Sequence, residues 1–294
     1  MARLSLSVPE NVPGEFFVDS TCIDCDTCRQ IAPATFGETG QFSFVQLQPR
    51  DDAGRRAAYR ALAACPTASI GASDKHAAAD AVREFPIQLA PRVFYNGFHS
   101  PKSYGGSSYF VQHADGNWLI DSPRFVEYLV RRFEEVGGVR YIFLTHRDDV
   151  ADAAKWAARF GAERIIHRLE LSSQPDAECV IDGIEPVTLA PEFLAIPTPG
   201  HTRGHCALLY REFLFTGDHL WWSRHRGRLT ASRDVCWWSW EEQVRSVQRL
   251  AAYDFEWVLP GHGERAHFAI DEMRRQVGQA IAFCGLSGVV VAHR

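Results

Sequence analysis

The chain has 294 residues, of which 46% are hydrophobic and 23% are charged, and its net charge is -5 at pH 7. This length predicts two domains, each able to bury a core. The mildly acidic balance gives no electrostatic reason to bind nucleic acid or an anionic membrane. No run approaches the roughly 20 apolar residues of a membrane span, and the N-terminus has no apolar signal segment. We therefore expect a cytoplasmic protein with a small-molecule partner.

The first 80 residues predict a small domain. Alternating apolar residues in segments 15–20 and 41–48 are typical of short strands, and segment 55–64 is typical of a short helix. The alanine-rich, charged stretch from Ala72 to Glu84 is interpreted as a linker. The expected domains are thus 1–80 and 81–294.

Strand and helix patterns alternate in the second domain. We expect helices after Ser122, from Asp149 to Phe160, and from Ser239, where Glu242 completes a capping box. Strands are expected at 107–122 (a hairpin), 140–144, 163–167, 193–197, 206–210, 213–217 and 256–260. Strand pairs mixed with intervening helices predict an α/β or αββα layered domain.

Four cysteines near the N-terminus have the spacing of an iron–sulfur motif. Cys22, Cys25 and Cys28 follow a C-x2-C-x2-C pattern, and Cys65 precedes Pro66 after 36 intervening residues. A tight loop can place three thiolates around one face of a [4Fe-4S] cube while a remote cysteine closes the other. A thiolate at position 25 favours four irons over three. The alternative is structural zinc, which normally uses two paired C-x2-C knuckles.

The segments CIDCDTCRQIAPATF and AACPTASI resemble the two halves of a single-cluster bacterial ferredoxin, over residues 10 to about 72. The resemblance implies that Cys22, Cys25, Cys28 and Cys65 bind a single [4Fe-4S] cluster. It also implies one-electron transfer at low potential.

Four motifs rich in histidine and aspartate follow predicted strands of the second domain. They are THRDD at 145–149, GHTRGH at 200–205, TGD at 216–218 and PGHG at 260–263. Imidazole and carboxylate ligands together suit zinc, iron or manganese. Loops at one edge of a sheet could aim these side chains at a shared metal.

The order of these motifs resembles that of the metallo-β-lactamase fold superfamily, from about Pro86 to the C-terminus. The resemblance implies an α+β chain, in which a ferredoxin-like domain precedes an αββα metallo-β-lactamase sandwich. The implied metal ligands are His146, His201, Asp218 and His262. Asp121 matches a structural strand-end aspartate, and His205 matches a residue that forms hydrogen bonds more often than it binds metal.

One motif departs from the family. Where H-x-H-x-D-H is expected after the third strand, the chain reads H-R-D-D-V-A-D-A, so Asp148 stands at the second histidine position. The Asp-His pair is lost, and Asp152 followed by alanine is the nearest candidate, with Asp149 as a substitute. These carboxylates are either metal ligands or charges that stabilise the N-terminus of a helix. One metal ion, iron or zinc, is therefore expected in this domain, and two if the carboxylates bind.

His146, His201 and Asp218 form the set of two imidazoles and one carboxylate that suits mononuclear non-haem Fe(II). Persulfide dioxygenases of the superfamily resemble this arrangement, while hydroxyacylglutathione hydrolases and lactamases use more ligands for two metals. We therefore expect a non-haem iron oxidoreductase that uses electrons from its own cluster. Its catalytic residues would be His146, Asp148, His201, Asp218 and His262.

Two other functions stay open. The first is a zinc-dependent hydrolase of a thioester, lactone or phosphoester, whose cluster is structural or senses oxidants. The second is a redox sensor without catalysis, whose second metal site has decayed.

Segment 220–240 contains five tryptophans and four arginines. One interpretation is a lid whose aromatic side chains enclose the substrate while an arginine binds its anionic group. The other is a surface that packs against the first domain or against a second copy in a homodimer. The cluster also gives a reason to expect a redox partner protein.

Overall fold

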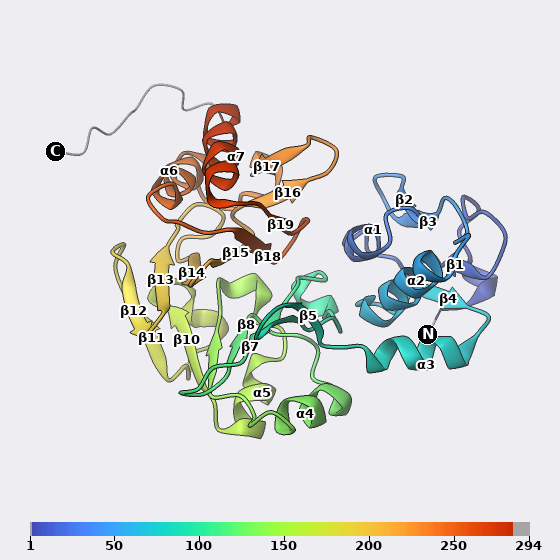
Figure 1. The fold of residues 1–294 in the computed structure, drawn as a ribbon, viewed down its shortest axis with the longest axis horizontal. Coiled ribbons are helices and arrows are strands. Elements are labelled where there is room, and N and C mark those ends of the chain that lie inside the picture. Colours follow the sequence, from blue (N-terminus) through green and yellow to red (C-terminus); the bar gives the residue numbers. More distant parts are fainter. Residues whose placement is uncertain (1, 285–294) are drawn as a thin grey trace. The chain divides into compact units, whose positions relative to one another are not determined.

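The computed structural model describes residues 2–284 (Figure 1). The chain divides into two compact units. The first unit runs to residue 142 and includes 148–163, and the second contains 143–147 and the chain from 164 onward. In the described part of the chain, every helix is too short or too polar to cross a bilayer.

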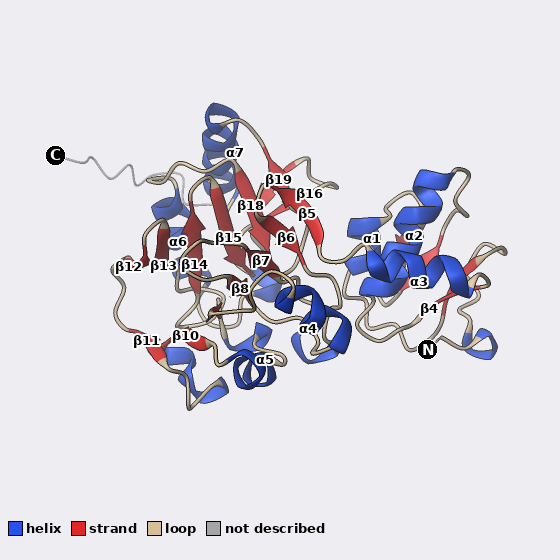
Figure 2. Cartoon of the chain, turned by 60° about the horizontal axis from the view of Figure 1, so that its bottom comes forward, coloured by secondary structure: helices blue, strands red, loops and turns tan. Residues whose placement is uncertain are grey.

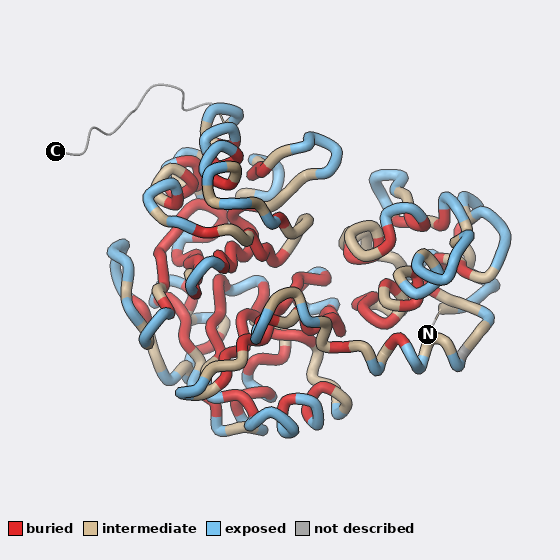
Figure 3. Tube along the Cα trace, viewed as in Figure 1, coloured by how far each residue is buried: buried red, intermediate tan, exposed pale blue. Residues whose placement is uncertain are grey.

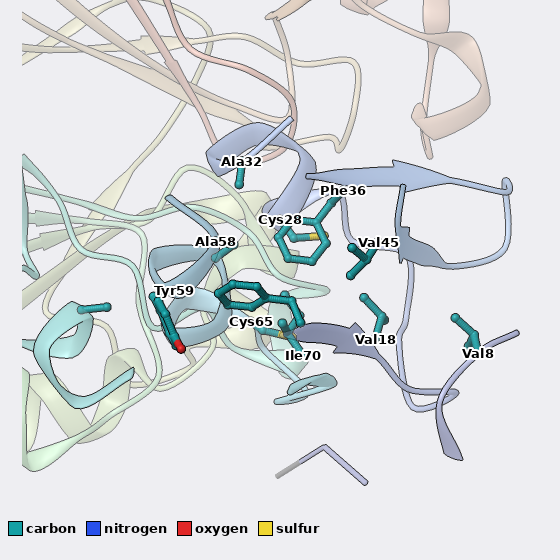
Figure 4. Packing of buried hydrophobic residues seen from close by; sticks show 13 residues of the cluster. Val8, Val18, Cys28, Ala32, Phe36, Val45, Ala58, Tyr59, Cys65 and Ile70 are labelled. Carbon is teal, nitrogen blue, oxygen red and sulfur yellow. The ribbon is translucent and has the colours of Figure 1, made fainter. Parts of the chain in front are cut away.

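The N-terminal part of the first unit has two small antiparallel strand pairs and a central helix. Its elements are β1 (Phe16–Val18) paired with β4 (Ile70–Ala72), β2 (Phe36–Glu38) paired with β3 (Ser43–Val45), the 3-10 turn η1 (Leu4–Leu6), α1 (Thr27–Ile31) and α2 (Asp52–Ala64). The short strands and the helix expected here are confirmed. Val18, Phe36, Val45 and Tyr59 form a core that also contains Cys28 and Cys65 (Figure 4).

The stretch expected to be a linker is instead a helix, α3 (Lys75–Arg83). Its N-cap residue Asp74 accepts hydrogen bonds from the backbone N–H groups of His76 and Ala77. The alanines that suggested a linker are strong helix formers, and Ala81 buries one face of α3 in the N-terminal core. The segment between the two expected domains is thus helical, and the expected boundary at residue 80 falls inside this helix. The division into domains 1–80 and 81–294 stays a prediction.

The rest of the first unit is an antiparallel run of four strands with two helices. The strands are β5 (Ile87–Ala90), β6 (Val93–Tyr95), β7 (Tyr109–Val111) and β8 (Trp118–Ile120), and the helices are α4 (Glu127–Glu134) and α5 (Ala153–Phe160). Phe133 of α4 stacks on Phe110 of β7 with ring centroids 4.5 Å apart, and Trp156 of α5 lies 5.4 Å from Phe133. These aromatic contacts fix both helices against the strands.

Two helices begin later than expected. The Ser122 hydroxyl donates to the carbonyl of Pro123, so it does not cap a helix, and α4 begins only at Glu127. The helix expected from Asp149 begins at Ala153, after the 3-10 turn η3 (Arg147–Asp149). Its expected end is confirmed, because Gly161 adopts the left-handed conformation that closes α5.

The second unit is built on a six-stranded sheet. Its strand order is β12 (Val187–Ala190), β13 (Phe193–Pro197), β14 (Cys206–Tyr210), β15 (Phe213–Gly217), β18 (Trp257–Pro260) and β19 (Ala266–His267). All five residues of β15 are buried, as Figure 3 shows for the centre of this sheet. The unit also contains β11 (Cys179–Ile181), which pairs in parallel with β10 (Glu163–His167), and the short pair β16 (Trp221–Ser223) and β17 (Arg228–Thr230). Strand β9 (Tyr141–Phe143) lies where the chain passes between the units.

Helices α6 (Trp240–Leu250) and α7 (Ile270–Phe283) cover one face of this sheet (Figure 2). Val247 and Leu250 of α6 and Val277 of α7 share a core cluster with strand residues such as Leu214. The expected N-cap of α6 is confirmed, because the Ser239 hydroxyl accepts a hydrogen bond from the backbone N–H of Glu242.

The register of the sheet brings three loops to one end of it. Strands β15 and β18 run parallel with Gly217 opposite Pro260, so the residues that follow both strands leave the sheet together. The turn between β13 and β14 leaves at the same end, because β14 runs antiparallel to β15. A fourth segment, which contains Thr145 and His146, joins these loops because the carbonyl of Thr145 accepts a hydrogen bond from the backbone N–H of Cys206.

The turn at Gly200 requires a glycine. Its φ is +152°, and a Cβ there would lie 2.2 Å from the Cα of Gln243 in α6. We expect Gly200→Ala to destabilise the protein by about 2–5 kcal/mol, because strain and overpacking coincide at this position. Urea or thermal unfolding measures the effect. Gly278→Ala is the matched control: nothing lies within 4 Å of that added Cβ, which sits in α7, so stability should rise slightly. Equal stability of the two variants would contradict the prediction.

Candidate metal centre and cluster site

Two histidines and one aspartate converge at the loop end of the second unit. The Nε2 atoms of His146 and His201 lie 3.5 Å and 3.7 Å from Oδ2 of Asp218. One ligand atom from each residue lies within 4.8 Å of the others, and all three side chains are buried. Two imidazoles and a carboxylate at this spacing fit a zinc or iron ion.

Neighbouring hydroxyls orient two of the imidazoles. Oγ1 of Thr145 lies 3.0 Å from Nδ1 of His146, and Oγ1 of Thr198 lies 2.8 Å from Nδ1 of His205. When Nδ1 of His146 donates to the hydroxyl, its Nε2 keeps the lone pair that a metal needs. Burial, with the nearby His146, holds the pKa of His205 well below its ordinary value, so that ring stays neutral.

Asp218 is held by the loop that contains His262. The backbone N–H of His262 donates to Oδ1 of Asp218 at 3.0 Å, and Nδ1 of the same residue lies 2.7 Å from that oxygen. Burial disfavours the charged form of Asp218, but His262 and His146 more than offset it and hold the pKa of Asp218 well below its usual range. The carboxylate is therefore ionised, as a ligand must be.

The three carboxylates after His146 differ in their surroundings. Asp148 is exposed. Asp152 binds Lys102 at 2.8 Å and accepts from the backbone N–H of Phe125, and Lys102 is the main group that lowers its pKa against burial. The groups of described side chains close enough to share an ion include neither Asp148 nor Asp152. Their assignment as ligands stays a prediction.

Asp149 is the buried carboxylate of this turn, only 2% exposed. A Cβ on Gly106 would lie 2.6 Å from its Oδ1, so only a glycine allows this approach. The 3-10 geometry of η3 turns Asp149 inward and leaves Asp148 outside. A buried carboxylate requires positive charge or hydrogen-bond donors close by.

Sequence reasoning missed Glu170, which connects two of the ligand loops. This fully buried carboxylate accepts from the backbone N–H of Gly204 at 2.6 Å and from that of Arg147 at 3.3 Å. It thereby joins the residue after His146 to the turn that contains His201. The only signal in the sequence is an acidic residue between Leu169 and Leu171, which does not indicate its partners.

His219 was also missed. It is fully buried beside Asp218, and within the described residues neither of its ring nitrogens has a hydrogen-bond partner. Burial lowers the pKa of His219 to about 3, with a smaller contribution from His201. The ring is therefore neutral.

The four N-terminal cysteines line one pocket. Backbone N–H groups point at two of their sulfurs: those of Asp24 and Ser43 lie 3.5 Å and 3.4 Å from Sγ of Cys22, and that of Ser69 lies 3.4 Å from Sγ of Cys65. Such donors stabilise thiolates that bind iron. The pocket and its donors fit a [4Fe-4S] cluster.

Burial raises the pKa of the Cys25 thiol to about 11 and raises that of Cys28 further. Without a metal these sulfurs stay protonated at neutral pH, so insertion of a cluster has to release protons.

Part of the tryptophan-rich segment lies beside His201. The backbone N–H groups of Trp237 and Trp238 donate to the carbonyl of His201, and the ring of Trp237 lies 5.9 Å from that imidazole. Trp237 and Trp238 are 61% and 44% exposed, and the guanidinium of Arg203 lies 5.8 Å above the Trp238 ring. An apolar wall with a cation thus borders the candidate metal centre.

These features define a class of protein in which a module able to hold an iron–sulfur cluster precedes a metal-binding domain. Residues 18–72 match the family described as "4Fe-4S single cluster domain of Ferredoxin I", and residues 103–262 match the "Metallo-beta-lactamase superfamily". The second match covers more than half of the chain, which therefore belongs to the metallo-β-lactamase superfamily. The expected α+β architecture, a ferredoxin-like domain followed by a metallo-β-lactamase fold, is confirmed.

Solved structures and a curated relative agree with this family. DIM-1 metallo-β-lactamase exposed to ceftazidime is similar with a TM-score of 0.52 and 18% identity, over 67% of this chain and 96% of that chain. A metallo-β-lactamase from Erythrobacter litoralis gives 0.52 and 18%, over 67% and 95%. A hydroxyacylglutathione hydrolase from Acidiphilium cryptum (strain JF-5) is 29% identical over 61% of this chain and 69% of its own length. At these identities the solved structures show the shared fold alone.

Glu170→Gln tests the connection between the ligand loops. The new amide nitrogen would face a backbone N–H donor, so one hydrogen bond is lost and a ligand loop moves. We expect metal affinity, measured by competition with a chelator, to fall about 10–100-fold. Glu163→Gln, at an exposed position, is the control. Unchanged affinity in Glu170→Gln would show that the loops do not need this carboxylate.

Asp148 was expected to bind the metal, but its side chain is exposed. Asp148→Asn should therefore leave metal affinity unchanged. Metal content after dialysis, compared with that of the unchanged protein, measures the effect, and a clear loss of metal would restore Asp148 as a ligand.

Proposed function

We propose that the chain is a metal-dependent oxidoreductase that binds a single iron ion at His146, His201 and Asp218 and uses electrons from its own cluster. The convergence of these three buried side chains is the observation that supports it most directly. Two imidazoles and one carboxylate are the ligand set of mononuclear non-haem iron, which leaves positions open for O2 and substrate.

A single ion is favoured over two because the second half of the usual ligand set is changed. The position of the second histidine holds the exposed Asp148. Asp152, where an Asp-His pair would stand, is occupied by Lys102 and by the backbone of Phe125. His262 stabilises Asp218 from the neighbouring loop.

The substrate we propose is a small anionic molecule. Trp237 and Trp238 provide an apolar surface beside His201, and Arg203 provides a positive charge above Trp238. The exposure of both rings favours a wall that the substrate contacts over a buried packing surface. A homodimer partner or a redox partner protein that covers the same rings stays a prediction.

A zinc-dependent hydrolase is the second candidate, favoured by the similarity to a hydroxyacylglutathione hydrolase. In that case the metal activates water and polarises a thioester carbonyl, and the cluster is structural or senses oxidants. The same residues would bind the ion, so the metal and the need for electrons distinguish the two functions.

Metal analysis of protein purified without air tests the proposal. We expect one iron per chain beyond those of the cluster, and we expect His201→Ala to lose that ion while it keeps the cluster absorbance. Cys28→Ser should lose the cluster and keep the second iron, because Cys28 belongs to the other site. Substrate-dependent O2 consumption should then require both sites.

Two other results of the metal analysis would replace the proposed function. Zinc in the second domain, with thioester hydrolysis that needs neither O2 nor reductant, would replace the oxidoreductase by the hydrolase. A second domain without metal beside an intact cluster would favour the redox sensor.

A further inference from the structure

A segment beyond the ferredoxin match lies against the cluster ligands. A Cβ on Gly105 would lie 2.7 Å from Cβ of Cys25 and 3.0 Å from its sulfur, and 3.3 Å from Cγ of Pro66. The φ of Gly105 is +87°, which favours glycine, so the backbone itself forms this contact. The backbone at residue 105 therefore packs directly against the cluster ligand Cys25.

His99 ties this segment to both halves of the cysteine motif. Its backbone N–H donates to the carbonyl of Ala64, the residue before Cys65. Its Nδ1 lies 2.9 Å from Oγ1 of Thr27, between Cys25 and Cys28, and 2.5 Å from the carbonyl oxygen of Gly105. The imidazole is 1% exposed. Residues 73–102 belong to neither matched family segment, so the families assign no role to His99.

The partners of His99 fix where its proton is. The Gly105 carbonyl can only accept, so Nδ1 carries the hydrogen. Nε2 is then an acceptor, and the hydroxyl of Tyr95 lies 2.6 Å from it in position to donate. With both ring nitrogens committed, the Thr27 hydroxyl cannot give its proton to the imidazole.

Oγ1 of Thr27 lies 3.4 Å from Sγ of Cys25 and 3.4 Å from the Gly105 carbonyl oxygen. As a thiol Cys25 donates to this hydroxyl, whereas as a thiolate it can only accept from it. That carbonyl already accepts from His99, whereas Cys25 becomes a negatively charged thiolate when iron binds. The charged acceptor makes the stronger hydrogen bond. The hydroxyl is thus directed at a cluster ligand.

We propose that His99 is a positioning residue for the cluster: together with Tyr95 and Gly105 it directs the Thr27 hydroxyl at Cys25 and thereby raises the reduction potential. Reduction adds negative charge to the cluster and its thiolates, and a hydrogen bond to a thiolate stabilises that charge. The inference concerns the cluster alone, so it stands whether the second domain is an oxidoreductase or a hydrolase.

EPR-monitored redox titration of the full chain, purified without air, tests this. Thr27→Val removes the hydroxyl and should shift the midpoint potential to a more negative value, while Thr27→Ser should restore it. His99→Leu should shift the potential in the same direction. The double variant should shift it no further than Thr27→Val, because both residues act through one hydrogen bond.

Matched controls are Thr39→Val and His76→Leu, which change exposed residues of the same types and should leave the potential unchanged. A shift in Thr27→Val without one in His99→Leu would overturn the role of His99, and no shift in either would overturn the whole arrangement. If the His99→Leu protein does not retain its cluster, Tyr95→Phe tests the role of His99 instead, because it removes only the hydroxyl that lies beside Nε2 of His99. This variant should shift the potential to a more negative value by a smaller amount. An unshifted potential would reject the proposal.

Discussion

A charged group is stable in a protein interior only beside groups of opposite charge or hydrogen-bond donors. The arrangement around Asp218 in the second unit satisfies this requirement. Its carboxylate is nearly buried, yet it stays ionised because a backbone N–H and the imidazoles of three histidines surround it. His262 and His201 reach it because two parallel strands end at the same level and the neighbouring turn leaves the sheet at the same end. His146 reaches it because the backbone N–H of Cys206 donates to the carbonyl of Thr145, the residue before it. A change in strand register would separate the ligands and leave the carboxylate buried without compensation.

Much of this arrangement could be predicted from the sequence, because its signals are local. Three of the four cysteines form a short-range pattern and the fourth is marked by the proline after it, and the histidine motifs each follow a strand whose apolar run is visible. Glu170 could not be found in this way, since its role arises from two backbone groups distant in the chain. The sequence also could not show which of Asp148 and Asp149 is buried. That depends on the 3-10 turn that contains them, because an α-helix and a 3-10 turn place consecutive side chains differently.

The fold of the second unit determines its scaffold and leaves the reaction chemistry open. Solved metallo-β-lactamases share the architecture at 18% identity, so the scaffold tolerates extensive change while the sheet and its loops persist. Reaction chemistry then depends on a few positions in those loops. In this chain the turn after His146 is the one that departs from the expected motif, and our proposal of a single metal ion rests on that departure.

Helix α3 has a practical consequence for anyone who wishes to study the iron–sulfur half in isolation. Ala81 fills part of the N-terminal core, and Glu84 pairs with Arg56 and Arg60 of α2. A gene fragment that stopped at residue 80 would cut this helix and uncover apolar surface, so it invites aggregation. Extending the fragment past Glu84 would keep the helix and its ion pairs, although it would still omit the loop around Gly105.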